Sequence, residues 1–283
     1  MNNATESEDI EARLLLEAIF LKYGTDFRGY SRLSVKRQIL KMVSDNDLKN
    51  ISELQHKMIW DGDFFEKLLP KFSINVTEHF RDPSFYKYFR EDIVPVLKTY
   101  PSLKIWHAGC ATGQEVYSMA ILLAEENLYG KTRIYATDIN AKALGLAKEG
   151  VYQNKELSQC SKNYVKAGGK KSFSEYIAVQ DQNFVMDKSI KNNIFFFDHN
   201  LVTDQTFVEA HVILCRNVLI YFDEDLTRRV VKLFYDSLHN QGFLCLGSRE
   251  RIMGSNTREK FNLIDMAEKI YRRYPSVLAN RES

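Results

Sequence analysis

Residues 104–125 read KIWHAGCATGQEVYSMAILLAE, and this stretch decides the fold. It begins with an apolar run of strand length at 104–108 and passes through a turn with Gly109 and Gly113 into a helical pattern at 114–127. A strand, a glycine-containing turn and a helix in this order are typical of the first unit of an open α/β sheet. Glycine there lets the backbone approach a ligand at the N-terminus of the helix, although a tight turn without a ligand has the same pattern.

Strands and helices continue to alternate toward the C-terminus. Further strands are expected at 133–137, 193–197, 211–215, 242–247 and 269–274, and further helices at 141–149 and 224–239. Because the strands are continuously apolar and alternate with helices, they predict a doubly wound, mostly parallel sheet that is covered on both faces. Residues 152–192 interrupt the alternation with a Gly168-Gly169 turn and alternating apolar residues, so a small inserted β-subdomain is expected there.

The residues before this region, from 9 to 73, contain helical patterns only. Apolar residues recur at helical spacing around Leu15 and Ile39. Two further helices are expected, one at 52–60 with Ser52 as its cap and one at 63–69. The sequence therefore predicts a small helical domain ahead of the α/β domain.

Charge and cysteine content narrow the class of protein. Thirty-nine basic and 37 acidic residues leave a net charge of +2, which is too small for a protein that wraps a nucleic acid. The four cysteines are too widely spaced for paired metal or redox motifs and favour a reducing compartment. The N-terminal stretch is polar and acidic, unlike an export signal, and no apolar run is long enough to span a membrane. We therefore expect a cytoplasmic protein that neither binds nucleic acid nor inserts into membranes.

One segment carries a local excess of positive charge, although the net charge of the chain is small. Between Arg28 and Lys49, six basic residues accompany two acidic ones. The excess is more typical of an ordinary solvated helix face, and the alternative is a docking surface for an acidic helical partner.

Polar residues follow the expected strands, where open parallel sheets bind their ligands. Asp138, at the end of the second strand, could accept hydrogen bonds from two ribose hydroxyls or could cap the helix that begins at 141. The Gly-x-x-x-Gly spacing departs from the Gly-x-Gly-x-x-Gly of dinucleotide sites, and Glu115 would repel a pyrophosphate. The same carboxylate suits the ammonium group of a methionine. The site therefore favours S-adenosyl-L-methionine over NAD.

Other reactive side chains near the strand ends give weaker patterns. Cys215 would need a partnered base such as His199 or His211 to act as a nucleophile, and a buried structural cysteine is the better interpretation. Asp198 adjoins His199, but no HxH or HxxxH partner accompanies the pair, so no metal site is predicted.

Several stretches, taken in chain order, resemble the chemotaxis receptor methyltransferases, which are CheR-like glutamate O-methyltransferases. They are SINVTEHFRDPSFY at 73–86, KIWHAGCATGQEVYSMAILLAE at 104–125, IYATDINAKAL at 134–144, ILCRNVLIYFD at 213–223 and GFLCLGSRE at 242–250. The helical start YGTDFRGYSRLSVKRQI extends the match to nearly the whole chain. The sequence departs from the family with Gln114 in place of the usual glutamate, His79 in place of an aromatic residue and Ser248-Arg249 in place of His-Ser.

The resemblance implies a class I S-adenosylmethionine-dependent methyltransferase fold. Its implied parts are an N-terminal all-helical domain at 1–73, a linker at 74–100 that contributes to the cofactor site, a methyltransferase domain at 101–283 and an inserted β-subdomain at about 152–192. The implied substrates are glutamates in the cytoplasmic helical region of methyl-accepting chemoreceptors, contacted through the basic helix 32–41 and the β-subdomain.

The resemblance also implies the residues of the site. Those expected to contact S-adenosyl-L-methionine are Asn75, Thr77 and Arg81 of the linker, Glu115 at the methionine end, Asp138 at the ribose, and Asn200, Leu201, Arg216 and Asn217 as further walls. Arg81 and Tyr221 are expected to face the transferred methyl group, and S-adenosyl-L-homocysteine is the expected product.

The chemistry agrees with this reading, because a glutamate with a reference pKa of ~4.3 is already ionised at neutral pH and needs no general base. We expect Arg81 to position and bind, with Tyr221 as the nearer hydrogen-bond donor. Two alternatives remain from the sequence: a signalling module that keeps cofactor binding but targets another protein or is non-catalytic, and an NAD-dependent dehydrogenase.

Overall fold

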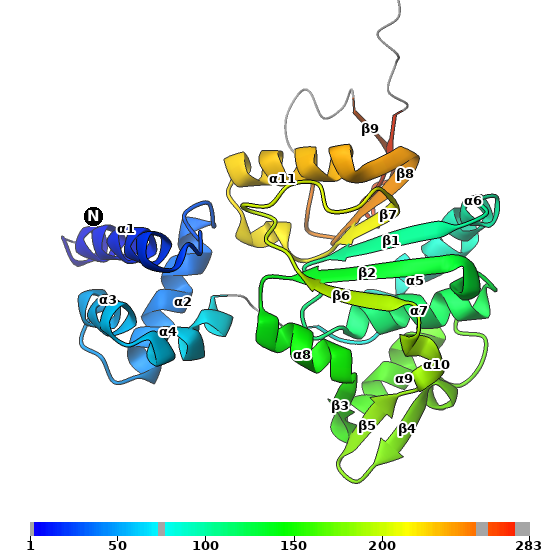
Figure 1. Ribbon diagram of the computed structural model, residues 1–283, viewed down its shortest axis with the longest axis horizontal. Helices are drawn as coiled ribbons and strands as arrows, with labels where there is room; N and C mark the ends of the chain where they lie inside the picture. The colour runs from blue at the N-terminus through cyan, green and yellow to red at the C-terminus, as the bar shows by residue number, and fades with distance from the viewer. Residues whose placement is uncertain (1–2, 73–76, 253–259, 275–283) are drawn as a thin grey trace, which may run out of the picture.

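The computed structural model describes residues 3–72, 77–252 and 260–274, and Figure 1 shows a helical N-terminal region beside an α/β region. The N-terminal helices are α1 (Asn3–Tyr23), α2 (Arg32–Asp45), α3 (Ile51–Trp60) and α4 (Gly62–Leu68), followed by the 3-10 turn η1 (Leu69–Lys71). They enclose an apolar core of their own, in which Leu15, Ile39 and Leu54 are fully buried. The helical patterns in this region are thus confirmed.

The expected cap of α3 is wrong by two residues. Asn50 is the cap, because its side chain accepts a hydrogen bond from the Glu53 N–H at 2.9 Å. Ser52 lies inside the first turn, and its hydroxyl instead donates to Glu11 of α1 at 2.5 Å. Asparagine and serine are both good capping residues, so the sequence pattern does not separate them.

The seven-stranded sheet has the order β6-β2-β1-β7-β8-β10-β9. Its strands are β1 (Leu103–Ala108), β2 (Thr132–Asp138), β6 (Ile194–Asp198), β7 (Ala210–Cys215), β8 (Leu238–Leu246), β9 (Phe261–Asp265) and β10 (Ile270–Arg273). The pairs from β6 to β8 are parallel, whereas β10 runs antiparallel to both β8 and β9. The mostly parallel sheet is confirmed, and β9 is an addition that the sequence pattern does not predict.

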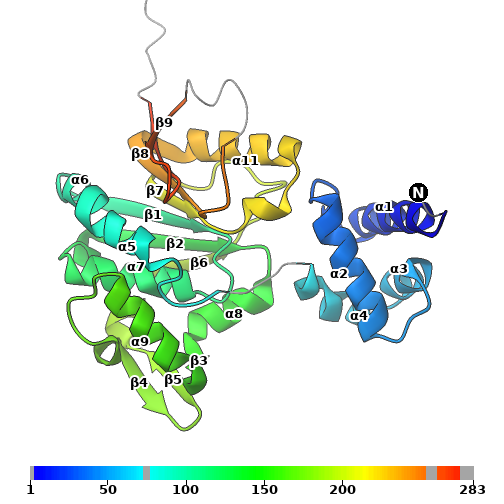
Figure 2. The same cartoon turned by 180° about the vertical axis from the view of Figure 1, so that it is seen from behind.

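Helices cover both faces of this sheet, as Figures 1 and 2 show. One face carries α11 (Glu224–Ser237), and the other carries α5 (Pro83–Tyr88), α7 (Gln114–Glu125) and α8 (Ala141–Glu149). Alternate residues of β1 enter the two cores, because Ile105 packs in the cluster with α7 and Trp106 packs in the cluster with α11. Between α5 and β1 the chain stays helical through the π-turn η2 (Phe89–Ile93) and α6 (Val94–Lys98).

Inserted between β2 and β6 is a second, three-stranded antiparallel sheet of order β3-β5-β4. The elements of this insertion are β3 (Val151–Gln153), η4 (Asn154–Glu156), α9 (Leu157–Lys166), η5 (Phe173–Tyr176), β4 (Ile177–Gln180), β5 (Asn183–Met186) and α10 (Lys188–Lys191). The 3-10 turn η3 (Tyr129–Lys131) lies outside it, directly before β2. A buried network ties the insertion to the C-terminal end of α7 and to η2, because Arg90 bonds Glu125 and Glu126 while Tyr164 of α9 donates to Glu125. A second, antiparallel sheet thus lies between β2 and β6 in the chain.

In the described part of the chain, one isolated β-bridge pairs the N-terminal region with the α/β region. Tyr30 forms this antiparallel bridge with Phe222. On either side, the Ser31 N–H donates to the Tyr221 carbonyl at 2.6 Å, and the Asp223 N–H donates to the Gly29 carbonyl at 2.9 Å. Helix α2 begins directly after the bridge, so its first turn lies next to the loop after β7. Among the described residues, no helix is long and apolar enough to cross a membrane.

Candidate active site

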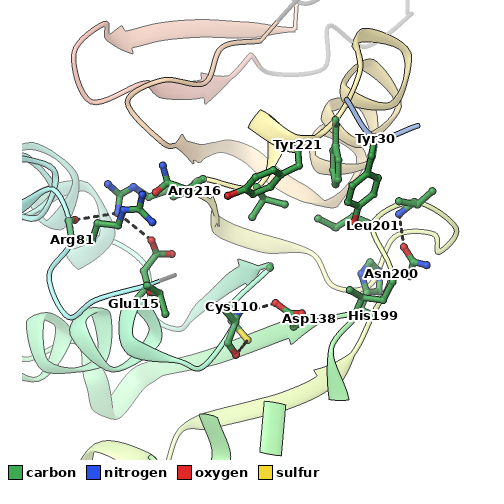
Figure 3. Close-up of a pocket in the computed structure, with 18 residues that line it drawn as sticks. Tyr30, Arg81, Cys110, Glu115, Asp138, His199, Asn200, Leu201, Arg216 and Tyr221 are labelled. Carbon is green, nitrogen blue, oxygen red and sulfur yellow. Dashed lines mark hydrogen bonds and ion pairs between the residues drawn. The ribbon is translucent and has the colours of Figure 1, made fainter. Parts of the chain in front are cut away.

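A pocket opens at the carboxyl ends of β1, β2, β6 and β7, where the strand order reverses direction (Figure 3). It encloses about 900 Å³, part of it open to solvent. The structure brings together in its lining nine of the residues predicted for the site, which are Thr77, Arg81, Glu115, Asp138, Asn200, Leu201, Arg216, Asn217 and Tyr221. The tenth, Asn75, lies outside the described residues.

Asp138 occupies the end of β2 with both carboxylate oxygens already bonded to backbone. Its Oδ2 accepts from the Ala111 N–H at 2.8 Å, and its Oδ1 accepts from the Asn140 N–H at 2.9 Å. The helix cap is Asn140, whose side chain accepts from the Ala143 N–H at 3.1 Å, so the capping alternative for Asp138 is wrong. Burial raises the pKa of Asp138, and these backbone N–H groups oppose the rise. A carboxylate oxygen can accept a second hydrogen bond, so two acceptors remain for ribose hydroxyls.

The turn after β1 is shaped for close approach by a ligand. Gly109 and Gly113 have φ of +78° and +90°, and a Cβ on Gly109 would lie 2.6 Å from Val218. Ala111 has φ of +48°, which is costly for an L-residue, and its N–H is held by Asp138. The turn therefore leaves no room for larger residues at Gly109 and presents a strained backbone to the pocket.

Arg216 and Glu115 form a buried ion pair at the other end of the pocket. The Arg216 guanidinium lies 3.1 Å from Glu115 Oε2 and 2.9 Å from Asp82 Oδ2, and it stacks 4.1 Å from the centre of the Phe85 ring. Burial would raise the pKa of Glu115, but a hydrogen bond with His107 and the charge of Arg216 outweigh burial and lower it. The free amino and carboxyl groups of a methionine carry opposite charges, and this pair offers both charges to such a ligand.

Arg81 and Tyr221 both line the pocket, and Arg81 lies at the end where Arg216 and Glu115 pair. In Figure 3 the Tyr221 hydroxyl points toward the side where Arg81 and Arg216 lie. Burial raises the pKa of Tyr221, and the nearby positive charge of Arg81 opposes the rise. Arg81 is flanked by two residues with positive φ, Phe80 at +52° and Asp82 at +53°. Such a conformation is rare and is found often at functional sites.

The sequence reasoning missed Tyr30. Its ring lines the pocket from the N-terminal region, across from Asp138, and packs 5.1 Å from the ring of Phe222. Burial raises the pKa of Tyr30, and the charge of Asp138 adds to that rise. A one-residue bridge brings it here from far away in the sequence, and such a bridge leaves no periodic pattern.

Two weaker hypotheses gain nothing from the structure. Cys215 is fully buried, and burial raises the pKa of its thiol well above the ordinary value, which leaves it protonated and a poor nucleophile. In the part of the chain that the structure describes, no three His, Cys, Asp or Glu residues are placed to hold a metal ion.

Comparison with known proteins identifies relatives along almost the whole chain. Residues 75–270 match the family model described as CheR methyltransferase, SAM binding domain. A Pseudomonas putida protein provisionally named methyltransferase Cher3 is 46% identical over 94% of this chain and 97% of its own. The chemotaxis protein methyltransferase of Borreliella burgdorferi is 27% identical over 88% of this chain and 90% of its own.

Among solved structures, the N-methyltransferase NodS of Bradyrhizobium japonicum, in complex with S-adenosyl-L-homocysteine, is similar with a TM-score of 0.39 and 14% identity. That comparison covers 69% of this chain and 88% of NodS. At this TM-score, the similarity carries no weight in the assignment.

Proposed function

This chain belongs to the CheR methyltransferase family, and we propose that it transfers a methyl group to glutamate side chains of chemoreceptors. It is a methyltransferase that uses S-adenosyl-L-methionine, so the dehydrogenase alternative is set aside. The observation that supports the proposal most is the convergence of Asp138, the Arg216–Glu115 pair and Tyr221 on one pocket. Relatives named as chemotaxis methyltransferases point to chemoreceptors as the class of substrate.

The residues fit this cofactor along the length of the pocket. Asp138 would accept from the ribose hydroxyls, and the Arg216–Glu115 pair would bind the charged methionine end. When bound, S-adenosyl-L-methionine supplies a methyl group on a positively charged sulfur. Arg81 and Tyr221 both line the pocket, and the Tyr221 hydroxyl points toward the end where Arg81 and Arg216 lie, so we place that methyl group close to these two side chains.

A carboxylate substrate explains how the site could act without a general base. A glutamate oxygen bonds to the methyl carbon as the carbon–sulfur bond breaks, giving a methyl ester and a neutral thioether with no proton to move. The protein must then hold the reacting atoms ~3 to 3.5 Å apart and in line, and exclude water. Tyr221 can donate a hydrogen bond to the oxygen that does not react, while the charge of Arg81 draws the carboxylate toward the cofactor.

Helix α2 is the proposed docking surface for the receptor helix. Arg32, Arg37 and Lys41 are exposed on it, and Leu33 on the same helix is 84% exposed. The Ser31 N–H, directly before α2, donates to the Tyr221 carbonyl at 2.6 Å, so the start of this helix lies beside a residue that lines the pocket. An acidic helix bound along α2 would therefore bring its glutamates close to Tyr221.

Lys36 of the basic helix 32–41 is not part of the proposed docking surface. Lys36 lies 2.6 Å from Asp9 and 3.0 Å from Glu8 of α1, so its charge is neutralised within the protein. The β-subdomain is the second proposed contact, because β4 is an edge strand and could pair with an extended segment of the receptor.

The test is transfer of labelled methyl groups from S-adenosyl-L-methionine to membranes that carry the organism's own chemoreceptors. The proposal predicts labelled receptor that releases methanol on mild alkali, as a carboxyl methyl ester does. Label on the receptor that resists alkali, or cofactor binding without any transfer, would contradict it and favour a differently targeted or non-catalytic protein.

A further inference from the structure

Glu250 is a buried carboxylate behind the wall of the pocket. It follows β8, and its side chain reaches across to the loop after the neighbouring strand β7. Only 3% of its surface is exposed. The backbone N–H groups of Asn217, Ile220 and Gly247 donate to its carboxylate at 2.9, 3.2 and 2.5 Å. Burial raises the pKa of Glu250, and these backbone N–H groups oppose the rise.

These donors surround the start of a short helical turn. The turn is η6 (Leu219–Tyr221), and it ends at the tyrosine that faces the pocket. The first N–H groups of a helical turn lack partners within it and need acceptors from elsewhere. Glu250 supplies these acceptors. Its Oε2 accepts from the N–H groups of Asn217 and Gly247, and its Oε1 accepts from the N–H of Ile220. One side chain therefore holds the loop at both of its ends.

The loop packs closely against the end of β8. A Cβ on Gly247 would lie 2.8 Å from the Asn217 nitrogen and 2.8 Å from Glu250 Oε2. Asn217 has φ of +63°, in the left-handed region, which asparagine adopts more readily than most other non-glycine residues. The hydrogen bond from the Asn217 N–H to Glu250 helps to keep it there.

We propose that Glu250 is a positioning residue for methyl transfer, which fixes residues 217–221 so that Asn217 and Tyr221 face the pocket together. Glu250 is not among the described residues that line the pocket, so it acts through the loop and not by contact with the reacting atoms. The identity of the methyl acceptor rests on the function proposed above, whereas the geometry of the loop does not.

The variant Glu250→Gln tests this with little change of shape. Its single acceptor oxygen is best placed at the Oε2 position, where two N–H groups donate, and its NH2 group then faces the Ile220 N–H. Two donors that face each other would displace the part of the loop that carries Tyr221. We expect kcat at saturating cofactor to fall on the order of tenfold to a hundredfold, because small misplacements of reacting groups have effects of that size. Affinity for S-adenosyl-L-homocysteine should change little.

The matched control is Glu126→Gln, which removes a buried carboxylate from the far end of α7. Glu126 lies 3.0 Å from Arg90 and is 7% exposed, so its loss should lower the melting temperature. It should leave kcat per folded molecule unchanged. A merely structural role for Glu250 predicts that Glu250→Gln behaves like this control.

Hydrogen exchange of the backbone amides supplies a readout that needs no receptor. In the parent protein the amides of Asn217, Val218 and Ile220 should exchange slowly, and in Glu250→Gln that of Ile220 should exchange much faster while β7 stays protected. Failure of the parent to methylate receptor membranes would sink the proposed function and leave this readout intact. The positioning role is overturned if Glu250→Gln keeps the parent kcat per folded molecule, or if its loop amides stay as protected as in the parent.

Discussion

At the scale of single residues, Asp138 is the side chain whose replacement tests the cofactor site most simply. Asp138→Ala removes the proposed ribose acceptors and also frees the Ala111 N–H that holds the turn after β1. Hydrogen bonds to a charged group contribute roughly 1.5 to 3 kcal/mol each, so affinity for S-adenosyl-L-homocysteine should fall at least about tenfold. Isothermal titration measures this, and a folded variant with parental affinity would remove Asp138 from the site.

Tyr221 should separate binding from catalysis. Tyr221→Phe removes only the hydroxyl that is proposed to orient the substrate carboxylate, so kcat should fall about tenfold while cofactor affinity stays nearly the same. Steady-state kinetics and titration on the same preparation measure both quantities. Tyr235→Phe, on the outer helix α11, serves as the control and should leave both unchanged. Equal losses of kcat and affinity in Tyr221→Phe would move this residue from the reaction centre to the cofactor wall.

His79, which stands in place of an aromatic residue of the family pattern, should lower the stability of the folded protein. Its ring is fully buried among Tyr152, Phe173 and Phe184, and neither ring nitrogen has a hydrogen-bond partner among the described residues. A phenyl ring at this position would leave no polar atom unpaired. His79→Phe should therefore raise the free energy of unfolding by roughly 1 to 3 kcal/mol, as measured by denaturant titration.

The same substitution should change how stability depends on pH. Burial lowers the pKa of His79 to about 3 from the usual 6.5. Between these values the unfolded chain binds a proton that the folded chain does not, so stability is full above pH 6.5 and is lost as the pH falls toward 3. The parent should lose stability over this range more steeply than His79→Phe, whereas the exposed His56→Phe should follow the parent. Parallel pH profiles for all three proteins would show that His79 does not titrate as the burial implies.

At this scale, the residues that follow strands are the ones that sequence reasoning could place in the pocket. Asp138 lies at the end of β2, where the rule that parallel sheets bind ligands at that edge points to it, and Arg216, expected from the family resemblance, directly follows β7. Sequence reasoning did not identify Tyr30 or Glu250. An isolated bridge places Tyr30 at the pocket, and Glu250 contacts the loop after β7 through backbone N–H groups. Neither kind of contact produces a residue pattern in the chain.

At the scale of elements, the docking role of α2 can be tested through its exposed cations. Replacing Arg32, Arg37 and Lys41 with glutamine should raise the KM for receptor and flatten its dependence on salt, because long-range attraction to an acidic helix is lost. Cofactor affinity should not change. Kinetics on receptor membranes at low and high ionic strength measure the effect.

The control for α2 removes the same charge from other exposed lysines of the N-terminal region. These are Lys49, Lys57 and Lys67, and their replacement by glutamine should leave receptor kinetics close to those of the parent. If the two triple variants behave alike, α2 is an ordinary solvated face and the receptor docks elsewhere.

Strands were predictable where the sequence contains an apolar run. The central strands β1 and β7 are nearly continuous runs of buried residues, and their positions agree with the expectation to within one residue. Strand β9 was not predicted, because it is a mostly exposed edge strand and lacks a continuous apolar run. The direction of β10 depends on the pairing of distant segments, which local pattern does not encode.

At the scale of the whole molecule, the pocket is a meeting point of segments that are distant in the chain. The N-terminal region contributes Tyr30, the segment before α5 contributes Arg81, and the sheet contributes Asp138 and Arg216. The bridge at Tyr30 also places α2 directly beside the loop that carries Tyr221. The proposed receptor surface and the proposed methyl-transfer site are thus adjacent, as a protein that modifies exposed helices requires.

The most direct test of this account is to locate the transferred methyl group by mass spectrometry. A cytoplasmic fragment of the organism's own chemoreceptor is incubated with S-adenosyl-L-methionine and either the parent protein or Asp138→Ala, then digested at neutral pH to preserve esters. The account predicts a single added methyl group on glutamate side chains of the receptor helices with the parent, and far less with the variant. Methyl groups on another residue type, or none on a receptor that a known methyltransferase modifies in parallel, would contradict it.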